Sequence, residues 1–158
     1  MTAKFSGVVG RSVACRKTVS ESDVYLFAGI TGDFSPNHVD QEFMKSTAYG
    51  DRVAHGALLV GYMSRASTLI TDECPELMAG HYPVSLGYDR IRFLQAVVIG
   101  DTINVNYVIA SVDPAKRRTL AKVEITNQTG ALCAVATHIM RWLERPTPDQ
   151  DKKGETKR

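Results

Sequence analysis

The second half of the chain alternates between apolar and polar positions, which is typical of strands with one buried face. Ile103, Val105 and Tyr107 fall on one side of such a run, and mainly polar side chains fall on the other. Runs that we interpret as strands lie at residues 83–99, 103–109, 121–126 and 131–143. Because short stretches rich in turn-forming residues separate most of these runs, the sequence predicts an antiparallel sheet.

Helical signals dominate the first half. Ser20 and Asp23 have the spacing of an N-cap and an acidic third helical position, so we expect a short helix that lasts until Gly29. Asp40 is expected to cap a second, brief helix that runs through Met44.

A longer, mostly apolar helix is predicted at residues 56–70. Small residues share one of its faces, at Ala57, Gly61, Ser64 and Thr68. Larger apolar side chains cover much of the remaining circumference, so we expect this helix to be buried nearly all round. One antiparallel sheet curled around a central helix would bury it in this way, which makes the predicted class α+β.

Composition places the chain among ordinary globular proteins. Its 158 residues correspond to about one domain, and 44% of them are hydrophobic while 23% are charged. The formal net charge is only +2, and several basic residues crowd into the last few positions. A concentrated basic face is absent from the pattern, so no nucleic-acid partner is expected.

The three cysteines lie far apart, with none of the close pairing of structural zinc or redox motifs. An odd number also argues against a disulfide framework, so a reducing, cytoplasmic location is expected. No leader and no apolar stretch of membrane-spanning length is evident, so no membrane association is expected. Residues 1–144 are predicted to form one domain, and residues 145–158 a polar, disordered tail.

Candidate chemistry is concentrated in residues 32–39, which we predict to be an ordered loop because they are rich in turn-forming residues. Asp33 and His38 lie in this loop, and Pro36 restricts the backbone between them. A carboxylate and an imidazole held toward one point can perform general acid–base catalysis at neutral pH. The alternative is that Asp33 stabilises a turn and His38 forms a hydrogen bond within the fold.

His55 and Gly56 stand where the apolar helix is predicted to begin. A helix N-terminus offers unpaired N–H groups, and glycine allows a substrate oxygen to approach them closely. Such a site would stabilise charge that develops on a thioester carbonyl. The alternative is ordinary capping with a small residue for close packing.

Together these segments resemble one family. The stretch Phe27-Ala28-Gly29-Ile30-Thr31-Gly32-Asp33-Phe34-Ser35-Pro36-Asn37-His38, followed by Ala54-His55-Gly56-Ala57-Leu58, is similar to the MaoC-like, (R)-specific enoyl-CoA hydratases. Their signature is Gly-Asp-x-Asn-Pro-x-His followed by His-Gly at a helix start. The resemblance extends over residues 19–142.

The resemblance implies a hot-dog fold, in which a sheet wraps around one long helix, and a homodimer or higher homo-oligomer. It implies that Asp33 and His38 are the catalytic pair and that the amide of Gly56 polarises the thioester carbonyl. Ser64 matches a serine near the active site of some members, although a small hydroxyl within a helix can also serve packing alone. No metal or separate cofactor is expected, because coenzyme A is part of the substrate.

Two positions depart from the family's pattern. Ser35 replaces the signature asparagine, and serine can make some of the same hydrogen bonds in a turn. Asn37 replaces the usual aliphatic residue before the histidine. If Asn37 points into the substrate pocket, it would favour a polar or dicarboxylic acyl chain; if it points outward, it has little effect.

Two further sets of residues have weaker interpretations. Metal binding is a minor alternative for a group of acidic and imidazole side chains, namely Asp33, His38, Asp40 and His55. Coenzyme A phosphates could meet a set of basic side chains, which is Arg90, Arg92, Lys116, Arg117 and Arg118. Charges at strand ends are more often simply solvated, and that reading remains open.

The function expected from the resemblance is hydration of the C2–C3 double bond of a trans-2-enoyl thioester of coenzyme A, or of acyl carrier protein, to a (R)-3-hydroxyacyl thioester. Two alternatives remain. One is a hot-dog thioesterase that hydrolyses the same class of substrate, and the other is a non-catalytic module that binds acyl thioesters.

Overall fold

A computed structural model describes residues 6–146 of the chain. The sheet has five strands, which are β1 (Ser12–Thr18), β2 (His81–Phe93), β3 (Thr102–Asp113), β4 (Arg118–Thr126) and β5 (Leu132–Glu144). The helices are α2 (Glu21–Thr31), α3 (Pro36–Val39), α4 (Gln41–Lys45), α5 (Gly56–Asp72) and α6 (Pro75–Met78). Within the described residues, none of these helices is long and apolar enough to span a membrane.

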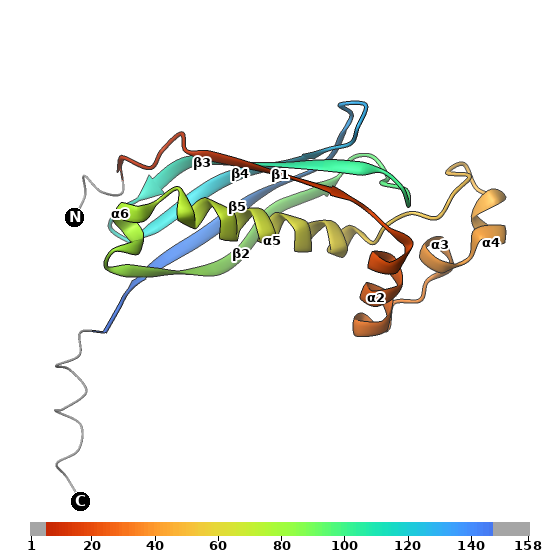
Figure 1. Cartoon of the computed structure of the whole chain (residues 1–158), viewed down its shortest axis with the longest axis horizontal. Coiled ribbons are helices and arrows are strands. Elements are labelled where there is room, and N and C mark those ends of the chain that lie inside the picture. The colour runs from red at the N-terminus through yellow and green to blue at the C-terminus, as the bar shows by residue number, and fades with distance from the viewer. Residues whose placement is uncertain (1–5, 147–158) are drawn as a thin grey trace, which may run out of the picture.

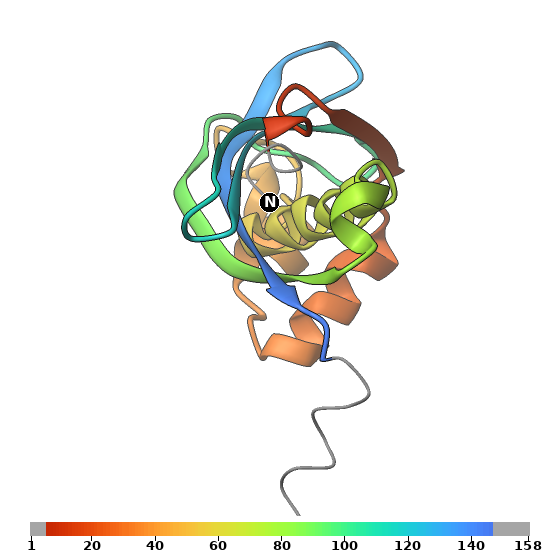
Figure 2. The same ribbon diagram turned by 90° about the vertical axis from the view of Figure 1, so that its left-hand side faces the viewer.

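The sheet is antiparallel and has the order β1-β3-β4-β5-β2. It curls around α5, as Figure 2 shows from one end of the helix. In Figure 1, α2, α3 and α4 gather at the N-terminal end of α5, beyond the edge of the sheet. This arrangement is the hot-dog fold and confirms the predicted α+β class.

The core forms between the concave face of the sheet and one side of α5. Ile103, Val105 and Tyr107 of β3 are buried, so the period of two predicted this strand and its inward face. From α5, Leu59 and Met63 pack into the same cluster. Burial of such side chains contributes roughly 1.5–3 kcal/mol each and is the main force that holds the helix to the sheet.

Burial of α5 differs from the prediction, because the helix is not covered on all sides. Its face of small residues is exposed in this chain, at Ala57, Gly61, Ser64 and Thr68. The sheet covers the opposite side, with contacts from β1 and β3. The sequence pattern showed that two sides of the helix differ, but it could not show that one of them lacks a cover.

Several boundaries also differ. Ser20 caps α2 with the predicted capping box to Asp23, yet the helix continues to Thr31 instead of ending at Gly29. Residues 36–39, predicted as part of a loop, form the single turn α3. The strand predicted at residues 83–99 ends at Phe93, and β1 was not predicted at all.

Asp40 caps α4 as predicted, accepting a hydrogen bond from the backbone N–H of Phe43 at 2.9 Å. The last strand ends at Glu144, at the end of the predicted domain. Most of the polar tail predicted at residues 145–158 lies outside the described residues.

Candidate active site

The loop that carries Asp33 begins where α2 ends. Gly32 adopts a positive φ of 80°, which glycine tolerates without strain, and its N–H closes the helix on Ala28. The carboxylate of Asp33 then accepts a hydrogen bond from the backbone N–H of Ser35 at 3.3 Å. Pro36 follows as the first residue of α3, where its missing N–H costs nothing. These local bonds hold the loop in one shape.

His38 lies in α3 with only 7% of its surface exposed. Its Nδ1 is 2.7 Å from the carbonyl oxygen of Val53, which can only accept, so Nδ1 carries a proton. In the neutral ring, Nε2 therefore has the free electron pair. The side-chain amide of Asn37 lies 3.2 Å from Nε2 and donates to it.

His55 connects the loop to the start of α5. Its Nε2–H donates to the backbone carbonyl of Asp33 at 2.9 Å, and its ring stacks on His38 with centroids 3.7 Å apart. The centroid of the Phe27 ring lies 4.8 Å from that of His55, with the two ring planes tilted by 51°. The ring of His55 is thereby fixed between α2 and α3, and it holds the backbone beside the Asp33 carboxylate.

Asp33, His38 and His55 converge. A carboxylate oxygen of Asp33 and one ring nitrogen from each histidine all lie within 4.8 Å of one another. A water molecule that makes two hydrogen bonds of ordinary length bridges groups that are about 4.5 Å apart. The pair predicted from the loop, Asp33 and His38, is therefore close enough to hold a single water between its members.

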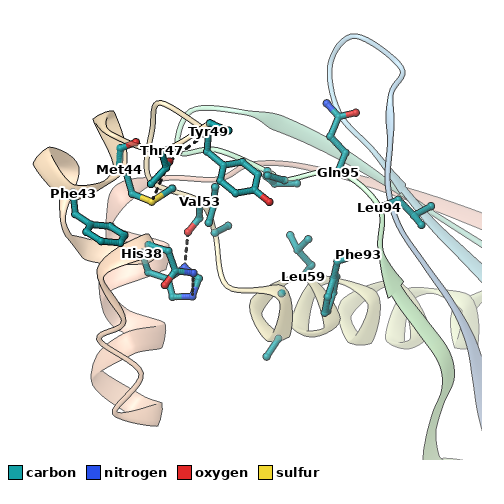
Figure 3. Close-up of a pocket in the computed structure, with 17 residues that line it drawn as sticks. His38, Phe43, Met44, Thr47, Tyr49, Val53, Leu59, Phe93, Leu94 and Gln95 are labelled. Carbon is teal, nitrogen blue, oxygen red and sulfur yellow. Dashed lines mark hydrogen bonds between the residues drawn. The ribbon is translucent and has the colours of Figure 1, made fainter.

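A cavity of about 640 Å³ opens beside His38. Figure 3 shows His38 on one side of it and Leu59 and Phe93 on the other, with Tyr49 reaching over the space between them. Its walls come from three segments, namely residues 37–49, 53–59 and 93–97. Most of these side chains are apolar, as expected of a site that binds an acyl chain.

The first turn of α5 forms part of the cavity wall through Gly56 and Ala57. The N–H groups at these positions have no acceptor within the helix, because no earlier turn exists. A Cβ at position 56 would lie 2.5 Å from Cε2 of Phe93, so any larger residue would displace that ring. Gly56 is therefore needed for the close packing of Phe93 against the start of α5, and it shares the cavity wall with His38.

Comparisons with known proteins agree with this geometry. The sequence model of the MaoC like domain matches residues 4–131. The (R)-specific enoyl-CoA hydratase of Rhodospirillum rubrum is 34% identical over 108 residues, which are 68% of this chain and 69% of that protein. The 3-hydroxybutyryl-CoA dehydratase of Methylorubrum extorquens is 34% identical over 110 residues, which are 70% of this chain and 65% of that protein.

The chain belongs to the MaoC-like domain family.

Among solved structures, the R-hydratase PhaJ1 from Pseudomonas aeruginosa superposes with a TM-score of 0.71 at 26% identity, covering 87% of this chain and 83% of that one. At the level of the family, these relatives support a hydratase or dehydratase. The MaoC-like motif maps onto the loop and helix start described above, with Ser35 and Asn37 at the two positions that depart from it.

The remaining predicted site residues of this MaoC-like chain occupy different places. Asn37 and Gly56 line the cavity, whereas His55 lies behind His38 and does not. Ser64 lies on the exposed face of α5, eight residues beyond Gly56, and is not part of the cavity wall. At 1.5 Å per residue, that separation is roughly 12 Å along the helix.

Sequence reasoning missed most of the cavity wall. Phe43, Thr47 and Tyr49 line one side and Phe93 and Gln95 another. Phe43 was predicted in a brief capped helix and residues 93 and 95 in a strand, while residues 47 and 49 were assigned to no element. The available signal was the presence of two aromatic side chains, Phe43 and Tyr49, shortly after the predicted catalytic loop. Phe43 and Tyr49 remain 49% and 64% exposed, which is unusual for aromatic residues with no partner to contact.

The alternative metal site receives little support from the geometry. Asp40 is not part of the cluster, since its carboxylate caps α4. The planes of the His38 and His55 rings differ by only 26° in the stack. A metal lies in the plane of each imidazole that binds it, about 2 Å from the nitrogen, and two stacked planes meet much farther away.

The basic residues considered for coenzyme A phosphates lie outside the cavity wall. Arg90 has a positive φ of 54° in an irregular stretch of β2 that also contains Arg92. Lys116 and Arg117 form ion pairs with Asp113 and Glu144. Arg118, in β4, is not exposed.

Proposed function

We propose that this MaoC-like protein is a hydratase that adds water across the C2–C3 double bond of a trans-2-enoyl-CoA to give a (R)-3-hydroxyacyl-CoA. The observation that carries the proposal is the approach of Asp33 and His38 within 4.8 Å. His38 lies in the wall of a cavity that reaches the first turn of α5, while Asp33 is exposed and lies outside that wall. The (R) configuration rests on the name of the relative from Rhodospirillum rubrum.

In the proposed reaction, the Asp33 carboxylate and Nε2 of His38 hold one water beside C3. One water O–H bond breaks and its proton passes to this pair, while the oxygen forms a bond to C3. The π electrons of the C2–C3 bond move toward the thioester, and the resulting enolate oxygen accepts hydrogen bonds from the N–H of Gly56. A proton held by the pair then moves to C2, so that one H and one OH have been added.

The arrangement of His38 supports its part in this reaction. Its Nδ1–H is committed to Val53, so only Nε2 can accept a proton from water. His55 fixes the backbone of Asp33 and stacks on His38, which keeps both groups in position before substrate binds. Catalysis then requires little rearrangement of the two side chains.

The decisive test is Asp33→Asn, which keeps the shape of the side chain and removes the base. We expect the rate of hydration to fall by ~10²-fold or more, because a general base contributes at least this much. The measurement is the loss of enoyl absorbance with a panel of enoyl-CoAs. Asp40→Asn is the matched control, since asparagine also caps helices well and Asp40 lies outside the site.

Three results would contradict the proposal. Near wild-type hydration by Asp33→Asn would remove Asp33 from the mechanism. Release of free thiol from acyl-CoA without hydration would favour the thioesterase, and binding of enoyl-CoA with no turnover at any chain length would favour a non-catalytic module. A thermal melt of each variant separates loss of activity from loss of folding.

A second copy of the chain is the partner that we propose, as a homodimer. The edge strand β2 is 13 residues long and carries exposed apolar side chains at Tyr82, Val84 and Leu86. The small-residue face of α5 is also uncovered. A long exposed sheet edge can pair with another chain, and an exposed apolar face can pack against one. Sedimentation of the full chain as a monomer at micromolar concentration would contradict a stable dimer.

A further inference from the structure

Asn37 interacts directly with the nitrogen that the proposed reaction needs. Its side-chain N–H donates to Nε2 of His38 at 3.2 Å, while Nδ1–H of the same ring donates to Val53 at 2.7 Å. Both ring nitrogens are therefore engaged in the free protein. The water that attacks C3 has to compete with Asn37 for Nε2, because this nitrogen has a single electron pair.

An aliphatic residue at this position, as in the motif that this chain resembles, could not make such a bond. Asn37 is also half-buried and lines the cavity, so it is near the place where the acyl chain would lie. An amide has two N–H donors and one carbonyl acceptor, and an apolar chain would leave part of this capacity unused. A ligand atom that accepts the N–H now donated to Nε2 would draw the amide away from the ring and release His38.

The lining of the cavity restricts what that ligand atom can be. Its polar members are uncharged or imidazole side chains, namely Asn37, His38, Thr47, Tyr49 and Gln95. Among the described residues that line it, none is lysine or arginine. A carboxylate placed there would lose its hydration without gaining an opposite charge, which is unfavourable. A neutral oxygen does not carry this cost.

We propose that Asn37 makes this site selective for enoyl thioesters whose acyl chain carries an uncharged oxygen on C4, next to the reacting double bond. That oxygen accepts the N–H of Asn37 and thereby frees Nε2 of His38 for the water. The inference rests on the proposed hydratase function and specifies its substrate class. The sequence alone allowed a polar or dicarboxylic acyl chain, and this inference selects a chain that is polar but uncharged.

A matched pair of substrates tests this selectivity. Hex-2-enoyl-CoA and 4-methoxybut-2-enoyl-CoA have chains of equal length, and they differ by one oxygen in place of a methylene group. The quantity measured is the ratio of kcat/KM for the methoxy substrate to kcat/KM for the plain one, in the wild type and in Asn37→Leu. Comparing the same ratio in both proteins cancels the intrinsic reactivity of the two substrates.

We expect Asn37→Leu to lower this ratio about 10-fold, because one neutral hydrogen bond to substrate changes kcat/KM by roughly 5-fold and release of His38 adds to it. The kcat/KM for the plain substrate should rise in Asn37→Leu, since no amide competes for Nε2. A generally damaged fold would lower both rates together and leave the ratio unchanged. Asn106→Leu, on an exposed position of β3, is the control and should keep the wild-type ratio.

If Asn37→Leu still hydrates both substrates but the ratio changes by less than about twofold, the inference is overturned. Wild-type preference for 3-carboxyprop-2-enoyl-CoA, which carries a carboxylate on C3, over both neutral substrates would overturn it as well. If the wild type hydrates none of these thioesters, the proposed function fails, and the selectivity inference fails with it. The first two results leave the proposed function intact, so the failures are distinguishable.

Discussion

Two histidines of this chain, His38 and His138, are both buried and both hydrogen-bonded through each ring nitrogen, yet their surroundings differ. His138 of β5 is fully buried, between the hydroxyl of Tyr107 at 2.7 Å from Nδ1 and that of Ser85 at 2.8 Å from Nε2. Its ring also stacks on Tyr88. His38 has instead a cavity on one side and a carboxylate within 4.8 Å.

The two histidine rings differ in whether water and substrate can approach them and exchange a proton. Burial lowers the pKa of His138 to about 4, so the ring stays neutral at physiological pH and serves as a hydrogen-bonding element of the core. His38 faces a space that can hold water and substrate, next to a second group that can take a proton. Burial and full hydrogen bonding are common to both histidines, so only the cavity and the neighbouring carboxylate mark the candidate catalytic one.

The largest expected effect that separates the two sites is on activity. His38→Gln should lower kcat/KM for hydration by roughly 10²- to 10³-fold, because glutamine cannot accept and return a proton at neutral pH. The free energy of unfolding should also fall, by roughly 1–2 kcal/mol, because the buried bond from Nδ1 to Val53 is lost. Steady-state kinetics together with urea denaturation measure both quantities, and a stability loss without a rate loss would reverse the assignment.

The next largest expected effect is a dependence of protein stability on pH that is caused by His138. The folded-state pKa is about 4, against about 6.5 for an unfolded histidine, so the unfolded chain binds a proton first as the pH falls. Stability from this group is complete above pH 6.5 and declines between pH 6.5 and 4, by about 3 kcal/mol in all. Denaturation curves at a series of pH values measure the decline.

His138→Gln is the matched control for this titration, because glutamine does not ionise in the same range. The variant should unfold more easily at pH 7 but show a flatter dependence on acid than the wild type. Equal slopes in the two proteins between pH 6.5 and 4 would show that other groups cause the acid sensitivity, and that His138 is not held neutral by burial.

A smaller effect is expected from Tyr107→Phe. The change removes the hydroxyl that bonds Nδ1 of His138 and leaves a buried nitrogen without its partner, which costs about 2 kcal/mol of unfolding free energy. Activity per folded molecule should stay at the wild-type value, because the hydroxyl lies in the core and not in the cavity wall. A large fall in kcat at unchanged stability would show that the surroundings of His138 contribute to activity, contrary to the distinction drawn between the two histidines.

Parts of the fold were predictable because their signals are local and strong. Ser20 and Asp23 form the expected capping box, and Ile103 to Ile109 alternate as a half-buried strand should. The strand β1 was not predicted because it lies at the sheet edge and only Cys15 in it is buried, so its residues show no apolar period of two. The turn α3 escaped because four residues that begin with Pro36 have the same composition as a loop.

The candidate site was predictable as a set of residues but not as a geometry. Spacing placed Asp33 and His38 in one loop, while the bond from His55 to the backbone of Asp33 joins segments 22 residues apart. No local pattern encodes such a contact. The partners of His138, likewise, come from β2 and β3 and are adjacent only in the folded sheet.

Two bonds described above close a ring in the chain. Val53 accepts from His38 and Asp33 accepts from His55, so the ends of residues 39–52 are tied together on a fixed frame. The enclosed segment contains α4 and contributes Phe43 and Tyr49 to the cavity wall. We therefore expect that grafting the corresponding stretch from another family member would reshape this wall of the cavity while Asp33 and His38 keep their anchors.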